Sequence, residues 1–379
     1  MPVSAEKRER LRKKAEQIAR EVVAPRAMEI DRCAEIPVEI RTAFLENGLL
    51  SVIMPDFYGG TGCDIPALCM VVEEIAKVCT SSSLLVLSHA VGTLPIYLSG
   101  KRALKERIFN QVVHGQVMAF ALTEPDAGSD AAAIKTRAIS NRAGYSVTGR
   151  KCFISFGETA GAYAAFVSTN PERALGGISC IVVEREQPGV SIGKIEEKMG
   201  MHGSDTAELI FDDVVVPKEN LVGEEGHGWY VAMSTLLRSR PAVGAQAVGL
   251  SQGARDYAVE FVKKHVRNGR PLCDSQWIRF KIAELDTQIE AARSLVYRTA
   301  SLVNMRRKGV ALERLSAMTK LFATDVAMMV TGETVQLLED QGYTRRTPLE
   351  RMMRDAKILQ IYEGTNQIQR LIIGHSIFK

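Results

Sequence analysis

The chain lacks most features that mark secreted, membrane or nucleic-acid-binding proteins. Its seven cysteines are an odd number with no C-x-x-C pair, and no Cys/His cluster has metal-ligand spacing. No apolar run approaches the roughly 18 to 20 residues of a membrane span. The net charge of +4 is small and evenly spread, so neither nucleic acid nor a membrane surface is an expected partner. These absences predict a cytoplasmic protein with reduced thiols.

A dinucleotide fingerprint and internal repeats are missing as well. The turn-rich loop at residues 54–62 contains Gly60 and Gly62 but lacks the third glycine and the strand–turn–helix context of a Rossmann motif. What is present is ordinary for a globular protein, with 46% hydrophobic and 24% charged residues. At 379 residues the chain exceeds one usual core, so two or three packed units are expected.

Hydrophobic periodicity divides the chain into a helical, a β and a second helical domain. Over 1–116, apolar residues recur at helical spacing, as at Leu11, Ala15 and Ile18. Over 117–225, short segments rich in β-branched and aromatic residues predict an antiparallel sandwich or barrel. The expected strands are 145–148, 152–155, 163–168, 178–184, 190–195 and 207–216.

Residues 226–379 carry long helical patterns that predict a four-helix-type bundle. The expected helices are 229–264, 275–307, 311–338, 348–362 and 366–377. The fold class is therefore α+β, with a middle antiparallel β domain between two helical domains.

One carboxylate stands at a sharp break between the last two helical patterns. Gly364 ends the first pattern, and Thr365 can cap the second. Glu363 at this break is clear of both backbone ladders, and the neighbouring glycine lets a substrate approach closely. A solvated glutamate at a helix end is the more common reading of such a residue by itself. A second polar stretch, at 121–130, exposes hydroxyls, carboxylates and N–H groups that could wrap a polar ligand.

Residues 121–130, 151–155, 203–214 and 336–370, together with the order of domains, resemble the acyl-CoA dehydrogenase family of flavoproteins over essentially the whole chain. The resemblance implies an FAD-dependent oxidoreductase that converts an acyl-CoA thioester to a trans-2-enoyl-CoA in fatty acid or carboxylic acid catabolism. A carboxylate removes the α-proton, and the β-hydrogen passes to the flavin as hydride. The resemblance also implies electron transfer to an electron-transfer flavoprotein and a homotetramer built as a dimer of dimers.

The resemblance assigns roles to individual residues. It implies that Glu363 is the catalytic base, as in the straight-chain branch of the family, and that its N–H polarises the thioester carbonyl. Ser239 stands at the position from which some branched-chain members supply the base. The implied cofactor contacts are Phe120, Leu122, Thr123, Gly128, Ser129, Phe153, Ser155, Gln336, Thr365 and Gln367. The implied substrate contacts are Ser129, Arg240, Glu363 and Gly364.

Four positions depart from the family pattern where it holds the adenine half of FAD, in part across a subunit interface. His265 and Asn268 replace an arginine and a phenylalanine, and Glu339 and Asp340 replace two glycines. Two carboxylates would repel a diphosphate, and the lost arginine removes a bidentate partner. Two alternatives therefore stay open. One is an FAD-poor member that performs non-redox proton transfer or lyase chemistry on a CoA thioester; the other is a non-catalytic partner subunit.

The helical pattern at 83–98 corresponds to the family's acyl pocket. It offers Ser88, His89 and Thr93 but no arginine, which disfavours a substrate with a terminal carboxylate.

Overall fold

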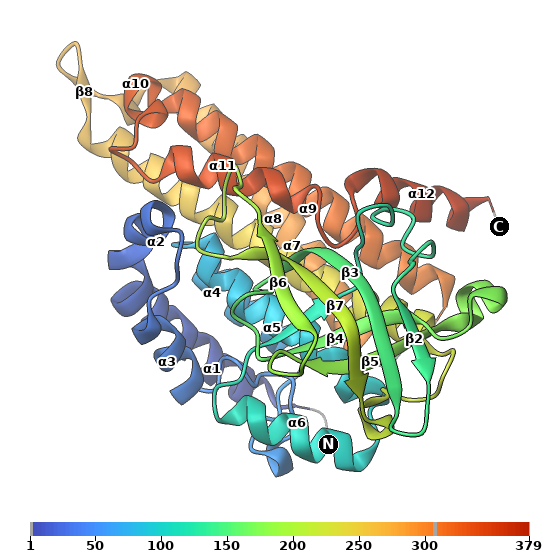
Figure 1. Cartoon of the computed structure of the whole chain (residues 1–379). Helices are drawn as coiled ribbons and strands as arrows, with labels where there is room; N and C mark the ends of the chain where they lie inside the picture. The colour runs from blue at the N-terminus through green and yellow to red at the C-terminus, as the bar shows by residue number, and fades with distance from the viewer. Residues whose placement is uncertain (1–2, 306–308, 379) are drawn as a thin grey trace.

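The computed structural model describes residues 3–305 and 309–378 (Figure 1). The ends of the expected domains at residues 1, 2 and 379 lie outside the described residues. The last two residues of the expected helix 275–307 lie outside them too.

The N-terminal domain is helical. Ser4 caps the first helix by accepting a hydrogen bond from the Lys7 N–H, and the helix buries Leu11, Ala15 and Ile18, as the spacing predicts. The helices are α1 (Ala5–Ile18), α2 (Ala27–Cys33), α3 (Val38–Glu46), α4 (Ile65–Ala76), α5 (Thr80–Ser99) and α6 (Arg102–Val113), with short helical turns η1 (Ala19–Val23), η2 (Ala24–Arg26) and η3 (Asp56–Tyr58).

Helix α5 is the one helix among the described residues that could cross a membrane by length and composition. Within the fold, 83% of its apolar window is buried. A buried core helix passes the same test of length and composition.

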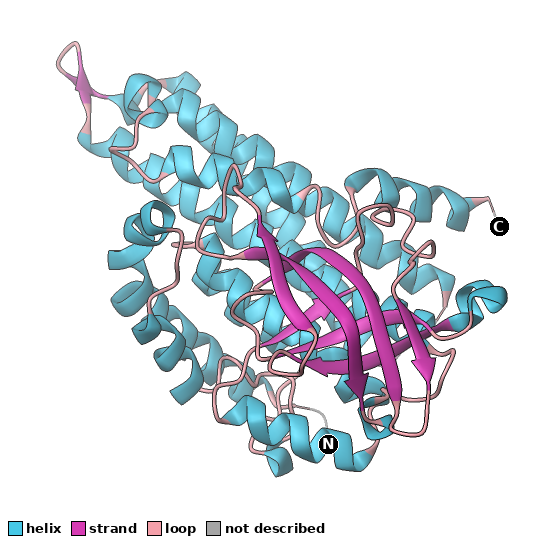
Figure 2. Ribbon diagram, in the orientation of Figure 1, coloured by secondary structure: helices cyan, strands magenta, loops and turns pink. Residues whose placement is uncertain are grey.

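The middle domain is a curled sheet of seven strands (Figure 2). Its strand order is β1-β4-β2-β3-β7-β6, with β5 paired to β4. The strands are β1 (Met118–Ala121), β2 (Arg137–Ser140), β3 (Tyr145–Ser155), β4 (Ala162–Ser168), β5 (Ile178–Glu184), β6 (Val190–Ile195) and β7 (Thr206–Val216), with helical turns η4 (Pro171–Gly177) and η5 (Lys218–Asn220).

The sheet is mainly antiparallel, but β4 runs parallel to β1 and, at one residue pair, to β2. The sequence did not predict β1 or β2. In β1, Met-Ala-Phe-Ala has no β-branched residue and pairs only with a distant strand. The sequence pattern also divided β3 in two, whereas the strand continues through two shifts of register against β7.

The C-terminal domain contains the long helices at nearly the expected positions. They are α7 (Gly228–Lys264), α8 (Gln276–Asn304), α9 (Val310–Leu337), α11 (Leu349–Leu359) and α12 (Asn366–Ile377), with the short α10 (Glu339–Tyr343), the hairpin β8 (Val266–Arg267) and β9 (Arg270–Pro271), and the turn η6 (Leu272–Asp274). Helix α7 packs against α4 and α5, against α8 and α9, and against β4 and β5. It therefore joins all three domains and carries residues into their shared core.

Candidate active site

The segment between α11 and α12 is a tight turn with an unusual backbone. Helix α11 ends at Leu359, earlier than the pattern to residue 362 predicts. The reason is that Glu363 (φ +55°) and Gly364 (φ +89°) both adopt the left-handed conformation, which cannot continue a helix. The N–H of Asn366 bonds the Gln360 carbonyl at 2.9 Å and closes the turn. The Thr365 hydroxyl accepts from the Ile368 N–H at 3.2 Å, so it caps α12 as predicted.

The Glu363 carboxylate faces groups from two other helices. The Ser239 hydroxyl on α7 donates to Glu363 Oε2 at 2.7 Å. Burial raises the pKa of Glu363, and this hydrogen bond, together with the charges of Arg240 and Lys320, opposes the rise. Within the described part of the chain, the N–H of Glu363 has no hydrogen-bond partner. The turn therefore presents a carboxylate and a free donor from one residue.

Arg240 is buried beside this turn, with 6% of its surface exposed. Burial lowers its pKa, and the charge of Glu363 opposes that shift. Its Nε is buried without a hydrogen-bond partner among the described residues. A buried guanidinium with an unused donor can bind an acceptor on a ligand.

A polar chain lies behind the carboxylate. The Tyr362 hydroxyl donates to Gln246 Oε1 on α7, and Gln246 Nε2 donates to Ser83 Oγ at 2.9 Å and to the Thr80 carbonyl at 3.2 Å on α5. These bonds fix Tyr362, the residue directly before Glu363, against the core.

Two residues expected in the acyl pocket, His89 and Thr93, form hydrogen bonds to backbone groups of the protein. Nδ1 of His89 accepts from the Met118 N–H at 3.1 Å, and burial lowers the pKa of His89 to about 4. The Thr93 hydroxyl donates to carbonyls of its own helix, at 2.9 Å to Ala90 and 3.1 Å to His89. The helical pattern does not locate the His89 contact, because its partner strand β1 was not expected.

The loop after β1 is held by a buried ion pair. Lys151 is fully buried, and its Nζ donates to Glu124 Oε1 at 2.6 Å and to the Leu122 carbonyl at 3.0 Å. Glu124 also accepts from the N–H groups of Lys135, at 2.6 Å, and Thr136, at 3.1 Å. The Glu124 carboxylate thus connects both ends of this loop to β3, and these buried hydrogen bonds make the loop rigid. We call the loop and the adjacent part of β3 the platform.

Several expected flavin contacts lie on this platform. Phe153 is 63% exposed and adopts the left-handed conformation at a shift of register in β3. The Thr123 carbonyl accepts from the Cys152 N–H at 2.9 Å, and a Cβ added to Gly128 would meet no atom within 4 Å. Leu122 is buried, Ser155 is half-buried and Ser129 is exposed. An exposed aromatic face beside an open loop fits a planar ring. Phe120 differs, because its ring packs against Phe166, 4.8 Å between centroids.

The residues expected near the diphosphate lie at the tip of the C-terminal bundle. Figure 1 shows β8 and α10 at the tip of the C-terminal bundle, away from β2 and β3. His265 stacks on Phe261 at 3.5 Å between ring centroids, and Asn268 occupies a left-handed turn. Glu339 pairs with Arg267 at 2.8 Å, and both are exposed. This group does not fit a diphosphate, because its one ion-paired arginine is already matched to a carboxylate.

Two other expected cofactor contacts lie at opposite ends of the same domain. Exposed Gln336 is 16 residues after Lys320 on α9, a rise of about 24 Å along the helix axis, which puts it at the tip of the bundle. Gln367 is exposed in the first turn of α12, beside the Glu363 turn.

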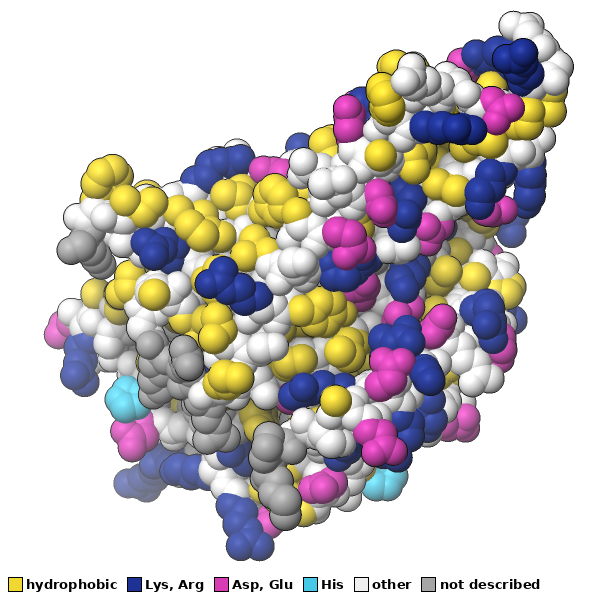
Figure 3. Space-filling model, turned by 180° about the vertical axis from the view of Figure 1, so that it is seen from behind, with side chains coloured by type: hydrophobic (Ala, Val, Ile, Leu, Met, Phe, Trp, Pro, Cys, Tyr) yellow, Lys and Arg dark blue, Asp and Glu magenta, His cyan; other side chains and the backbone are white. Residues whose placement is uncertain are grey.

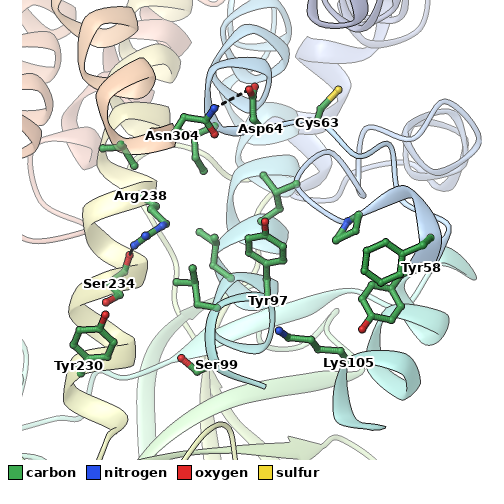
Figure 4. Close-up of a pocket in the computed structure, with 17 residues that line it drawn as sticks. Tyr58, Cys63, Asp64, Tyr97, Ser99, Lys105, Tyr230, Ser234, Arg238 and Asn304 are labelled. Carbon is green, nitrogen blue, oxygen red and sulfur yellow. Dashed lines mark hydrogen bonds between the residues drawn. The ribbon is translucent and has the colours of Figure 1, made fainter. Parts of the chain in front are cut away.

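A separate cavity of about 520 Å³ lies on another face of α7 (Figure 4). Tyr230, Ser234 and Arg238 line it at helical spacing, whereas Ser239 and Arg240 follow on the face toward Glu363. Its wall includes an Asn304 side chain that donates to Asp64 at 3.0 Å. This cavity is not part of the carboxylate site.

Sequence reasoning missed the buried lysines of the site. Lys151 and Lys320 are both fully buried, at 0% relative exposure. The available signal was position: on α9, Lys320 shares the buried face of Ala317 and Thr324. A lysine on the apolar stripe of a helix needs buried partners.

Three sequence profiles match nearly the whole chain. They are described as acyl-CoA dehydrogenase N-terminal domain, middle domain and C-terminal domain, and match residues 5–116, 119–214 and 226–378. Cyclohex-1-ene-1-carbonyl-CoA dehydrogenase of Syntrophus aciditrophicus is 44% identical over 357 residues, 94% of this chain and 86% of its own length.

Two solved structures are close in fold. Butyryl-CoA dehydrogenase from Megasphaera elsdenii has a TM-score of 0.95 at 38% identity, with all of both chains covered. A chain solved in work on the electron transferring flavoprotein of Acidaminococcus fermentans has a TM-score of 0.96 at 39% identity, covering 100% of this chain and 99% of that one.

Proposed function

The chain belongs to the acyl-CoA dehydrogenase family, and on that premise we propose that it oxidises an acyl-CoA thioester between its α and β carbons, with Glu363 as the base. The observation that carries this proposal is the Glu363 turn. It offers a partly buried carboxylate of raised pKa and, from the same residue, an N–H without a partner among the described residues. A base that takes a proton from carbon needs that raised pKa, and the enolate that forms needs a donor at its oxygen.

In the proposed reaction the α-proton moves to the Glu363 carboxylate. The Glu363 N–H donates to the thioester oxygen, where negative charge develops. Ser239 keeps the carboxylate oriented through its 2.7 Å hydrogen bond. Buried Arg240, with its free Nε, binds the CoA part of the substrate, and the backbone of Gly364 lets the thioester approach. Ser129 contributes a further substrate contact.

FAD is the cofactor we propose, and when bound it accepts the β-hydrogen as hydride. Phe153 and Ser155 would cover the flavin ring, with Leu122, Thr123, Gly128 and Ser129 around it. Thr365 and Gln367 would contact it from the turn into α12. Phe120 would support this surface from β1, since its own ring is packed against Phe166.

The residues expected to bind the adenine half of FAD do not support binding in the same way. We propose that His265, Asn268, Glu339 and Asp340 hold no diphosphate, and that FAD binds weakly or through other contacts. Gln336 lies at the same end of the bundle, and we propose that it does not contact the diphosphate either. The same observation favours one alternative, a family member that uses Glu363 for proton transfer or lyase chemistry without redox turnover. A non-catalytic partner subunit is less supported, because a scaffold needs no carboxylate at this turn.

The proposal extends to partners and setting. The likeness to a chain solved with an electron transferring flavoprotein supports such a protein as the electron acceptor. Exposed apolar side chains on the C-terminal helices support a homotetramer, a dimer of dimers; Figure 3 shows hydrophobic side chains gathered on the face seen from behind. The exposed apolar side chains of the C-terminal helices include Trp277, Phe280, Phe322, Met329, Leu371 and Ile377. Seven cysteines without a disulfide support a cytoplasmic location.

Purified protein tests the proposal directly. We expect a flavin absorption spectrum, before or after reconstitution with FAD, that an acyl-CoA bleaches. The panel includes butyryl-CoA and cyclohexane-1-carbonyl-CoA, because relatives of both kinds are similar over the whole chain. Protein that takes up no FAD but exchanges α-protons of a thioester with D2O supports the non-redox alternative. Protein that does neither contradicts a catalytic role.

A further inference from the structure

Lys320 is the residue whose position the proposed reaction leaves unexplained. It lies on α9 with no exposed surface, and burial lowers its pKa to about 7, opposed by the charge of Glu363. Burying an ammonium group costs several kcal/mol unless its donors are satisfied. The hydrogen bonds that the Lys320 ammonium donates must therefore offset the cost of its burial.

Both acceptors of Lys320 belong to the Glu363 turn. Its Nζ donates to the Gly364 carbonyl at 2.9 Å and to Asn366 Oδ1 at 2.8 Å. Asn366 is itself buried, and its Nδ2 donates to Thr324 Oγ1 at 3.0 Å and to Asp325 Oδ1 at 2.7 Å, both on α9. Lys320 and Asn366 thus fasten the turn to α9.

The turn needs such an anchor because its backbone is strained. Glu363, a residue with a Cβ, stands in the left-handed region directly before left-handed Gly364. The Gly364 carbonyl accepts a second hydrogen bond, from Gln369 Nε2 at 2.8 Å. With two donors on that carbonyl, the peptide that follows Gly364 is fixed, and the direction of the Glu363 N–H and side chain is fixed with it.

We propose that Lys320 is a positioning residue: by holding the Gly364 carbonyl and the Asn366 side chain, it fixes the turn that aims the Glu363 carboxylate and N–H at the substrate. This inference rests on the proposed function of Glu363. Lys320 also adds positive charge to the site, in which Glu363, Arg240 and Asp325 are the charged groups that act on it.

The test compares Lys320→Met with Thr331→Val, a matched change at another fully buried polar residue of α9. Thr331 bonds only carbonyls of its own helix. The measured reaction is exchange of the α-protons of butyryl-CoA or cyclohexane-1-carbonyl-CoA with D2O, followed by NMR, which does not depend on hydride transfer. We expect kcat for Lys320→Met to fall by about 100-fold with KM within about threefold, since a misplaced catalytic group loses rate more than binding.

The pH profile separates positioning from general stability. Loss of the cation raises the pKa of Glu363, so the acid limb of kcat/KM moves to higher pH in Lys320→Met and stays in place in Thr331→Val. Unchanged kcat and an unmoved limb in folded Lys320→Met would overturn the inference. If that variant does not fold, Asn366→Ala removes one acceptor and keeps the ammonium. It should lower kcat by about tenfold with KM unchanged, and wild-type kcat in Asn366→Ala would overturn the inference as well.

A final control separates this inference from the proposed function. Exchange that Glu363→Gln abolishes but Lys320→Met leaves intact contradicts only the role of Lys320. Absence of exchange in the wild-type protein contradicts the role of Glu363, and the role of Lys320 with it.

Discussion

The two ends of the C-terminal domain differ in how their charges are matched. At the Glu363 turn, buried Arg240 and Lys320 lie near one carboxylate. Hydrogen bonds from Lys320 and Gln369 to the Gly364 carbonyl hold the left-handed backbone of this turn. At the tip, Glu339 and Asp340 are exposed, and the paired Arg267 lies on the neighbouring hairpin. The first end is organised around the Glu363 carboxylate, the proposed base. At the second end, the carboxylates of Glu339 and Asp340 would repel the anionic diphosphate proposed to bind there, so these residues support the proposed proton removal better than the proposed FAD contact.

Replacement of the base should have the largest effect. We expect Glu363→Gln to lower turnover by roughly 10³- to 10⁴-fold, because an amide cannot accept the α-proton, and to leave thioester affinity nearly unchanged. Turnover with an acyl-CoA and an artificial acceptor measures the first, and ligand titration the second. Glu284→Gln, at an exposed carboxylate on α8, is the control and should retain the wild-type rate. A near-normal rate in Glu363→Gln would remove the assignment of the base.

Loss of the buried ion pair that holds the loop after β1 should come next. Lys151→Met leaves Glu124 buried and uncompensated, so we expect the free energy of unfolding to fall by roughly 3 to 5 kcal/mol. Urea denaturation measures this change. Lys135→Met is the matched control: the Lys135–Asp126 pair has side chains 75% and 74% exposed, so its loss should leave the free energy of unfolding almost unchanged. Similar losses in both variants would show that burial does not distinguish the two pairs.

The sequence predicts the parts of this fold that depend on local pattern. The order of helical, β and helical domains follows from periodicity, and the Thr365 cap from residue type and position. Strand β1 and its parallel pairing with β4 were not predictable, because the partner strands lie more than 40 residues apart. Lys320 was missed for the same reason: its partners Gly364 and Asn366 are distant in sequence. The roles of the site residues stay predictions.

Substitutions at the tip of the bundle test whether its carboxylates weaken the binding of FAD. We expect His265→Arg combined with Glu339→Gly and Asp340→Gly to lower the Kd for FAD by at least about tenfold. The change removes two carboxylates, adds a guanidinium and frees Arg267 from Glu339. Glycine also suits position 339, whose φ is +52°. Flavin fluorescence during titration gives the Kd, with Glu333→Gln on α9 as the control. An unchanged Kd would mean that the diphosphate binds elsewhere.

The smallest change we predict concerns Ser239, which tunes the base without taking the proton. Its hydrogen bond to Glu363 Oε2 favours the carboxylate form and opposes the rise in pKa that burial causes. Ser239→Ala removes that opposition, so the pKa of Glu363 rises and the active form is lost sooner as pH falls. We expect the acid limb of kcat/KM to move to higher pH, with the rate at high pH nearly unchanged. Ser234→Ala, on the face of α7 that lines the separate cavity, should leave the limb in place. A limb that moves down in Ser239→Ala would mean that the serine accepts from a protonated Glu363, and that the resting base is the acid.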